Sequence, residues 1–224
     1  MRRSRPAFEL VAVLALLLAL VWRAGDWLAP TEAIADGLDV VFALSLLAIV
    51  ALCWWRDGIG PRALGLLPSQ WGAGWGSMAL FMAGGVASLA IAGASLGSTS
   101  LAEARLGWLG DYAPGITAQQ LLLHGFFAPH IATLARGLSP RPRRVATIVF
   151  SSAIFVALHA PNPALMLGVA IACAFWTWHF LVHRNLLAVL ASHLVLGVTA
   201  MAALGPGPML NLRVGSGALE LLFR

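Results

Sequence analysis

The sequence predicts an all-α, polytopic membrane helix bundle with about seven transmembrane helices. Hydrophobic residues make up 60% of the 224 residues and charged residues only 10%, and the mean hydropathy is +0.86. A soluble domain needs far more charge to cover its surface. The apolar runs are continuous and do not alternate with polar residues, which favours helices. We expect residues 1–204 to form a single transmembrane domain and residues 205–224 to form a C-terminal tail.

Three apolar runs precede the middle of the chain. The first follows three arginines, and no small-x-small cleavage site comes after Trp22, so we interpret it as a span and not as a signal peptide. The second ends in a tryptophan pair, as expected at a membrane interface. The third contains Gly72 and Gly76, a GxxxG pattern typical of close helix packing. These predicted spans cover residues 7–22, 38–55 and 71–94.

Four further runs complete the bundle. Pro129 predicts a kink in the first of them. Each run is close to the ~20 residues with which a helix crosses ~30 Å of hydrocarbon, although the second and fourth are short. They cover residues 116–134, 145–160, 164–182 and 186–203. In the tail, the segment from Gly215 to Gly217 resembles a linker, so we leave the last ten residues out of the functional interpretation.

The distribution of arginine predicts the orientation. All fourteen basic residues are arginines, and with seven spans ten of them fall on the side of the N-terminus. The positive-inside rule therefore places the N-terminus in the cytoplasm, and we expect an integral protein of a bacterial inner membrane. No segment combines basic and aromatic residues into a surface for nucleic acid. The two cysteines, Cys53 and Cys173, lie in apolar runs and are expected to be buried free thiols.

Polar side chains concentrate in the fourth predicted span. Gln119, Gln120 and His124 interrupt an otherwise apolar segment, and on a helix Gln120 and His124 share one face. Polar groups inside a membrane are costly and often mark a functional site. They also stabilise helix pairs through hydrogen bonds, and the segment alone does not decide between these interpretations.

Two more histidines and an asparagine lie in or beside neighbouring spans, at His159, Asn162 and His193. Imidazole is the usual acid–base group near neutral pH and the commonest metal ligand. A buried cluster of this composition is suited to hold a water for hydrolysis, or a divalent metal through His159 and His193.

Three motifs in order resemble the CPBP family, the CAAX-protease and bacteriocin-processing membrane proteins that include the CAAX prenyl endopeptidases. The family's Glu-Glu-x-x-x-Arg followed by Gly aligns with residues 119–125, Gln-Gln-Leu-Leu-Leu-His-Gly. Its Phe-x-x-x-His aligns with Phe155 to His159, and Pro161-Asn162 follows. Its His-x-x-x-(Asn or small) aligns with His193 to Gly197. Residues 63–66, Ala-Leu-Gly-Leu, are also similar, so the resemblance covers about residues 62–201.

The first motif departs from the family pattern. The resemblance implies that the first glutamate activates the attacking water while the histidines bind water or stabilise an oxyanion. Gln119 and Gln120 replace the two glutamates, and a neutral amide cannot take up a proton. A positioned general base typically contributes ~10²–10⁴-fold to the rate. His124 replaces the arginine, which would otherwise be an unpaired buried charge, so the three changes are mutually consistent.

Several functions remain open from the sequence. We expect a non-catalytic binding, immunity or assembly factor, or a structural subunit of a membrane complex. The alternative is an intramembrane endopeptidase of the CAAX-protease type that acts on a peptide or lipidated substrate with altered residues. The expected partners are the lipid bilayer and a peptide, lipidated segment or other subunits. Transport is a weaker candidate, since no inverted repeat is evident.

The resemblance also implies that the two glutamines and three histidines converge on one interior cavity. With the fourth span starting near residue 116, Gln119 lies about four residues from the outer face. His193 lies ~15 Å below that face. The residues then meet only if helices tilt or if a polar funnel opens on the non-cytoplasmic side.

Overall fold

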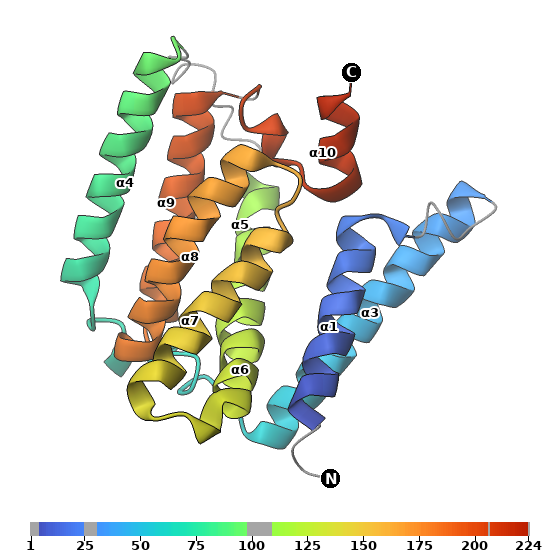
Figure 1. Cartoon of the computed structure of the whole chain (residues 1–224), viewed down its shortest axis with the longest axis vertical. Helices are drawn as coiled ribbons and strands as arrows, with labels where there is room; N and C mark the ends of the chain where they lie inside the picture. The colour runs from blue at the N-terminus through green and yellow to red at the C-terminus, as the bar shows by residue number, and fades with distance from the viewer. Residues whose placement is uncertain (1–4, 25–30, 98–108, 206, 224) are drawn as a thin grey trace.

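The computed structural model describes residues 5–24, 31–97, 109–205 and 207–223, and within them the chain is helical and contains no strand (Figure 1). The α-helices are α1 (Arg5–Val21), α3 (Glu32–Asp57), α4 (Trp75–Ser95), α5 (Leu109–Leu122), α6 (Ala128–Leu134), α7 (Pro140–Ala157), α8 (Pro163–His183), α9 (Leu186–Leu204) and α10 (Gly215–Leu222). Short 3-10 and π segments connect several of them. The prediction of an all-α polytopic membrane bundle is confirmed.

Four helices among the described residues are long and apolar enough to cross a membrane by themselves: α3 from Ile34, α4, α8 and α9. The other predicted spans form helices beside them. Helix α1 has 17 residues, α5 and α6 are separated by a π segment, and α7 begins with Pro-Arg-Pro-Arg-Arg. Buried polar residues occur in both sets, for example Gln120 in α5 and His193 in α9.

The side chains are distributed as expected for an apolar solvent. Leu80 and Ile91 of α4 and Leu167 of α8 are 76%, 69% and 68% exposed. In contrast, Gln120 and Asn162 are fully buried. Exposed leucines are stable in lipid, whereas a polar group facing lipid is not. Apolar groups outside and polar groups inside fit a protein embedded in a membrane.

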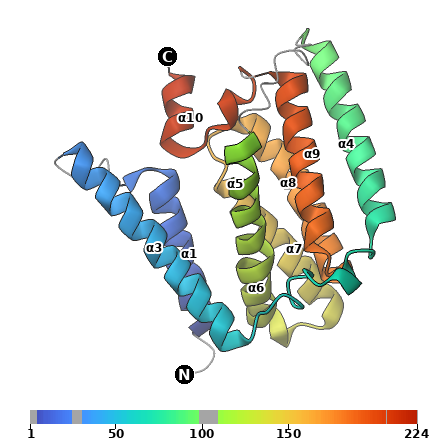
Figure 2. The same cartoon turned by 180° about the vertical axis from the view of Figure 1, so that it is seen from behind.

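Figure 1 shows which connections share an end of the bundle. The N-terminus lies at the same end as the α3 C-terminus, the α6–α7 connection and the α8–α9 connection, while the C-terminus lies at the opposite end. The view from behind in Figure 2 agrees. Since these connections carry most of the arginines, we call this end the arginine-rich end.

Glycines allow helices α4 and α9 to approach closely, but not at the predicted positions. A Cβ at Gly93 would lie 2.9 Å from the backbone carbon of Ala203, and a Cβ at Gly85 would meet the Leu196 side chain. Gly72 and Gly76 have nothing within 4 Å, and Gly72 precedes the helix, which begins at Trp75. The prediction that the GxxxG pattern makes a packing contact is wrong, because those residues lie at the exposed start of the span.

An asparagine cap fixes where α9 begins. At the start of α9, Asn185 Oδ1 accepts from the Ala188 amide at 3.0 Å, while its Nδ2 donates to the carbonyls of Trp71 and Ala73 at 2.8 Å each. The side chain thereby satisfies a helix N-terminus and two carbonyls of a remote turn.

The tail packs on the bundle. The segment that resembled a linker starts α10, and the Gly215 amide donates to the Ala160 carbonyl at 2.8 Å. Ala218 is fully buried. The expectation of a linker is wrong here, because Gly215 supplies a left-handed φ of 56° at the start of the helix and packs against the backbone of Val21.

Candidate functional site: an amide–imidazole cluster

A local irregularity positions the first motif. Residues 123–127 form a π segment in which the Ala128 amide donates to the Leu123 carbonyl. Pro129 has no N–H for the Gly125 carbonyl, and the Trp54 indole donates to that carbonyl instead, at 2.9 Å. A Cβ at Gly125 would lie 2.8 Å from the Trp54 ring, so only glycine permits this contact. The kink predicted from Pro129 is therefore a π bulge held by α3.

The central contact of the cluster joins α5 to α9. Gln120 Nε2 donates to His193 Nδ1 at 2.8 Å, and both side chains are buried. An amide N–H only donates, so Nδ1 accepts and the ring proton of the neutral His193 is on Nε2. The amide at the second glutamate position thus fixes a tautomer in which Nε2 of His193 is a donor.

The early start of α5 explains how the first motif can meet His193, although the sequence placed the first motif nearer the outer membrane face than His193. Helix α5 begins at Leu109 and continues through Pro114, seven residues earlier than the predicted start at Ile116. Gln120 then lies 11 residues after the first residue of α5, and His193 lies 11 residues before Leu204, the last residue of α9. At 1.5 Å per residue each lies about 16 Å from the end of its own helix, and the hydrogen bond between them shows that they meet in the interior.

His124 lies one turn after Gln120. Its Nδ1 donates to the Gln120 carbonyl at 3.2 Å, and its ring centroid is 4.7 Å from that of Phe180. The buried Nε2 has no hydrogen-bond partner among the described residues. His193 lies near enough to His124 and His159 for the charged forms of the rings to repel one another, so the three imidazoles share one region of the interior.

His159 reaches this region because α7 ends part-way along the bundle (Figure 1). Its Nδ1 donates to the Phe155 carbonyl at 2.6 Å. The Phe155 ring lies 4.7 Å from the His159 ring and 6.3 Å from the His193 ring, between centroids. The side chain is buried and does not lie at the outer surface.

Aromatic side chains that the sequence did not single out enclose His193. The Trp176 ring lies 4.6 Å away and its indole donates to Ser192 Oγ at 3.0 Å. Tyr112 meets the His193 ring edge-on at 6.3 Å. Its hydroxyl group packs on Gly197, where the family motif has an asparagine or a small residue. The four-residue spacing of Trp176 and Phe180 on α8 is the sequence signal for this inward aromatic face.

Two predicted residues occupy different surroundings. Gln119 is half-buried, and its Oε1 has no hydrogen-bond partner among the described residues. Asn162 caps α8 by accepting from the Leu165 amide at 3.1 Å, and donates to the carbonyls of Met209 at 2.8 Å and Arg213 at 3.0 Å. Its amide group therefore holds the tail to the bundle.

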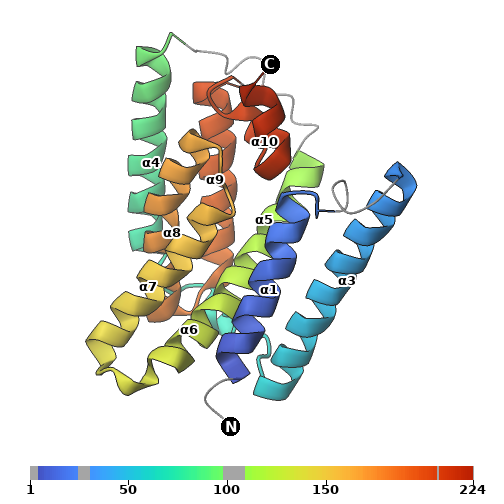
Figure 3. The ribbon, with the colours of Figure 1, turned by 45° about the vertical axis from the view of Figure 1, so that its right-hand side comes forward.

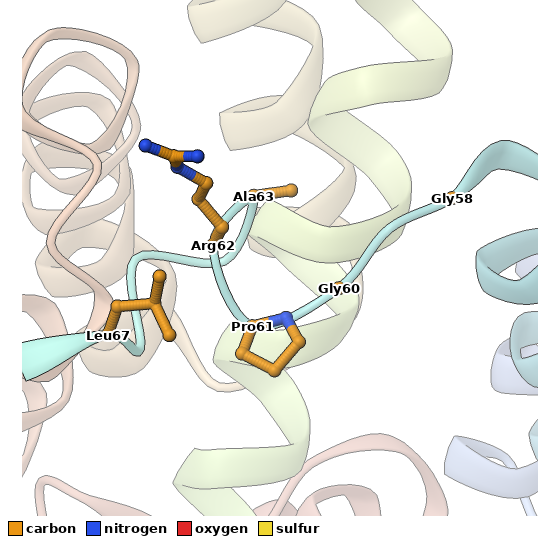
Figure 4. Close-up of a pocket in the computed structure, with 6 residues that line it drawn as sticks. All are labelled: Gly58, Gly60, Pro61, Arg62, Ala63 and Leu67. Atoms are coloured by element: carbon orange, nitrogen blue, oxygen red, sulfur yellow. The ribbon is translucent and has the colours of Figure 1, made fainter.

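A separate pocket of about 480 Å³ lies in the connection after α3 (Figure 4). Figure 4 shows the Arg62 side chain extending from this connection. Residues of the amide–imidazole cluster do not line the pocket. The lining residues are Gly58, Gly60, Pro61, Arg62, Ala63 and Leu67.

The fold and the cluster define a polytopic helical membrane protein with amides and imidazoles buried between its helices. Residues 108–199 match a family model described as Rce1-like, Type II CAAX prenyl endopeptidase Rce1-like. The resemblance to the CPBP family is confirmed over this segment, which contains all three motifs. No curated protein and no solved structure matches the chain in the corresponding searches.

Proposed function

We propose that this protein is a non-catalytic CPBP-like membrane factor that binds a peptide or lipidated segment, with a role in immunity, assembly or complex structure. The observation that carries the proposal is the hydrogen bond from Gln120 to His193. The interactions of the cluster among the described residues involve amides, carbonyls and rings, and none involves a carboxylate. A site of this composition lacks the strong base that the family chemistry requires.

Buried acceptors without donors support binding. Gln119 Oε1, Gln120 Oε1 and His124 Nε2 have no hydrogen-bond partner among the described residues. The two amide oxygens are acceptors. Buried acceptors need donors, and a peptide backbone supplies N–H groups in series. His193 Nε2–H adds one donor suited to a peptide carbonyl.

The remaining features of the proposal concern the surroundings of the site. We place the protein in a bacterial inner membrane with the arginine-rich end in the cytoplasm, following the positive-inside rule. Residues 1–204 would then form one transmembrane domain with a CPBP-like core at about 62–201. A polar funnel from the non-cytoplasmic side would give the peptide its route to Gln119.

One observation favours the alternative, an endopeptidase with altered residues. The neutral His159 donates through Nδ1 to Phe155, which leaves Nε2 as a free base. A water between His159 and His193 would then be polarised by imidazoles alone. A divalent metal bound by both histidines would require the His193 proton to move from Nε2 to Nδ1 and the Gln120 amide to turn so that its oxygen accepts from Nδ1. This arrangement replaces a carboxylate with a weaker and neutral base.

Binding and cleavage can be separated in one experiment. Detergent-purified protein is mixed with a panel of prenylated and unmodified peptides that carry a photo-crosslinker, and both adducts and fragments are measured by mass spectrometry. We expect adducts on α5 or α9 without fragments, and fewer adducts with His193→Ala. Wild-type cleavage that is lost with His159→Ala would instead establish the endopeptidase.

A further inference from the structure

A second group of ionisable side chains lies outside the amide–imidazole cluster, between the N-terminal helices and α6. Glu9 of α1, Cys53 of α3 and His130 of α6 place their ligand atoms within 4.8 Å of one another. The side chains of His130 and Glu9 are only 4% and 12% exposed, and Cys53 is buried. Figure 3 shows α1 between α3 and α6. We call this group the Glu9–Cys53–His130 site.

In neutral His130, the lone pair of Nε2 faces the Glu9 carboxylate. Its Nδ1 lies 2.8 Å from the Phe126 carbonyl, which only accepts, so Nδ1 carries a proton. Nε2 lies 3.2 Å from Glu9 Oε2. In the neutral ring Nε2 has a lone pair, so two lone pairs point at each other in a buried place. Such a contact is stable only with a cation between the atoms, either a proton or a metal ion.

The dimensions suit a tetrahedral metal. Ligands at ~2.0–2.1 Å from a tetrahedral zinc ion lie about 3.3 Å apart, close to the separation of Nε2 and Oε2. A thiolate at ~2.3 Å lies about 3.6 Å from the other two ligands, so Cys53 Sγ needs to move inward by about an ångström at most. One thiolate, one imidazole and one carboxylate form a donor set that zinc favours.

The charges also balance. A divalent ion with the Glu9 carboxylate and the Cys53 thiolate forms a neutral unit, and binding releases the thiol proton to solvent. Arg56 contacts both Glu9 oxygens, at 3.0 Å for Nη2 to Oε2, but it also pairs with Asp57 at 2.6 and 2.7 Å. Arg56 therefore keeps a carboxylate partner when a metal takes Glu9. Arg5 Nε donates to Glu9 Oε1 at 3.1 Å, so it leaves the other oxygen, Oε2, as the one that faces His130 and a metal.

We propose that Glu9, Cys53 and His130 form a zinc-type site that fastens the N-terminal helix pair to α6. His130 lies in the helix that follows the π bulge, and Glu9 and Cys53 lie outside the segment that matches the family model. The site is separate from the proposed peptide-binding cluster. Its role is to hold α1 and α3 against the helix that carries the first motif.

The test uses the full-length protein purified without a histidine tag and without chelators. Metal content is measured by mass spectrometry, and the cobalt-loaded protein is examined for thiolate-to-cobalt charge-transfer absorption. We expect about one zinc per chain and a cobalt–thiolate band. Glu9→Gln, Cys53→Ser and His130→Gln should each weaken zinc binding at least about tenfold, since even residues that only support a ligand cost that much.

Cys173→Ser and His183→Gln are matched controls, because Cys173 is the other buried thiol and His183 is a histidine distant from the site. Both should retain the metal. The wild-type cobalt spectrum is independent of whether the variants fold. Its lack of a thiolate band, or zinc retained by all three site variants, would overturn the proposal and leave a shared proton between His130 and Glu9.

Discussion

Gln120 Nε2 lies 2.8 Å from His193 Nδ1, and this hydrogen bond joins two motifs that are 73 residues apart in the sequence. The amide sets the direction of the bond. A carboxylate at the same place would accept from Nδ1–H and leave Nε2 of His193 as a base. The difference between a glutamine and a glutamate therefore decides whether this histidine offers a proton or a lone pair to a ligand.

Restoring the family motif should restore chemistry only when all three residues change. Gln119→Glu alone creates a half-buried carboxylate without its arginine partner, so we expect little cleavage. The triple variant Gln119→Glu, Gln120→Glu, His124→Arg restores the charge pairing and the His193 tautomer, and should cleave faster than the single variant. Peptide cleavage by the purified variants, with His193→Ala added as a control, measures this. Equal activity of the single and triple variants would contradict the pairing argument.

The indole of Trp54 should be essential for the π bulge. Trp54→Phe leaves the buried Gly125 carbonyl without a donor, because Pro129 cannot supply one. We expect a loss of about 1–3 kcal/mol in stability, measured by thermal unfolding in detergent. Trp55→Phe is the control, since Trp55 is 82% exposed and should tolerate the change. Equal effects at the two positions would show that the carbonyl contact contributes nothing.

Gly197 and Tyr112 should show strong coupling. A Cβ at Gly197 would lie 2.7 Å from Tyr112 Cζ and closer still to the hydroxyl oxygen. Gly197→Ala should cost about 1–3 kcal/mol through overpacking. Tyr112→Ala should remove the clash and make Gly197→Ala nearly neutral in the double variant. Additive losses in the same unfolding assay would mean that the two residues do not pack together.

Asn162 should act through structure. Asn162→Asp keeps the N-cap acceptor but loses both donors to the tail, whereas Asn162→Ala loses all three hydrogen bonds. At roughly 1 kcal/mol for each bond, the aspartate variant should be less stable than wild type and the alanine variant less stable again. Proteolysis near Arg213 should increase in both. Unchanged stability with lost peptide adducts would point to a role in binding.

The orientation can be tested with topology reporters. Fusions after Arg143, at the arginine-rich end, and at the C-terminus should report opposite sides of the membrane, with Arg143 in the cytoplasm. Both reporters on one side would contradict the arrangement of the helices, whereas a reversed pair would contradict only the orientation.

The sequence by itself determined the fold class, the approximate positions of the helices and the three motifs, whereas four of the seven predicted spans are helices long and apolar enough to cross a membrane among the described residues. These depend on composition and on local spacing, since a run of about 20 apolar residues has few stable conformations other than a helix in lipid. Short-range chemistry also identified Pro129 as an irregularity. The family match over residues 108–199 agrees with the residues that the motifs singled out.

Only the tertiary structure decided which polar groups meet. The start of α5 at Leu109 brings Gln120 to the depth of His193, and Pro114 within that helix concealed it in the sequence. Trp54, Tyr112 and Trp176 contact the motif residues from other helices, and the Glu9–Cys53–His130 site combines three helices. Such contacts depend on helix tilt and on the close approach of glycines, which are set by packing across the bundle. The local pattern in the chain shows at most which face of a helix is aromatic, as for Trp176, and does not show which residue that face meets.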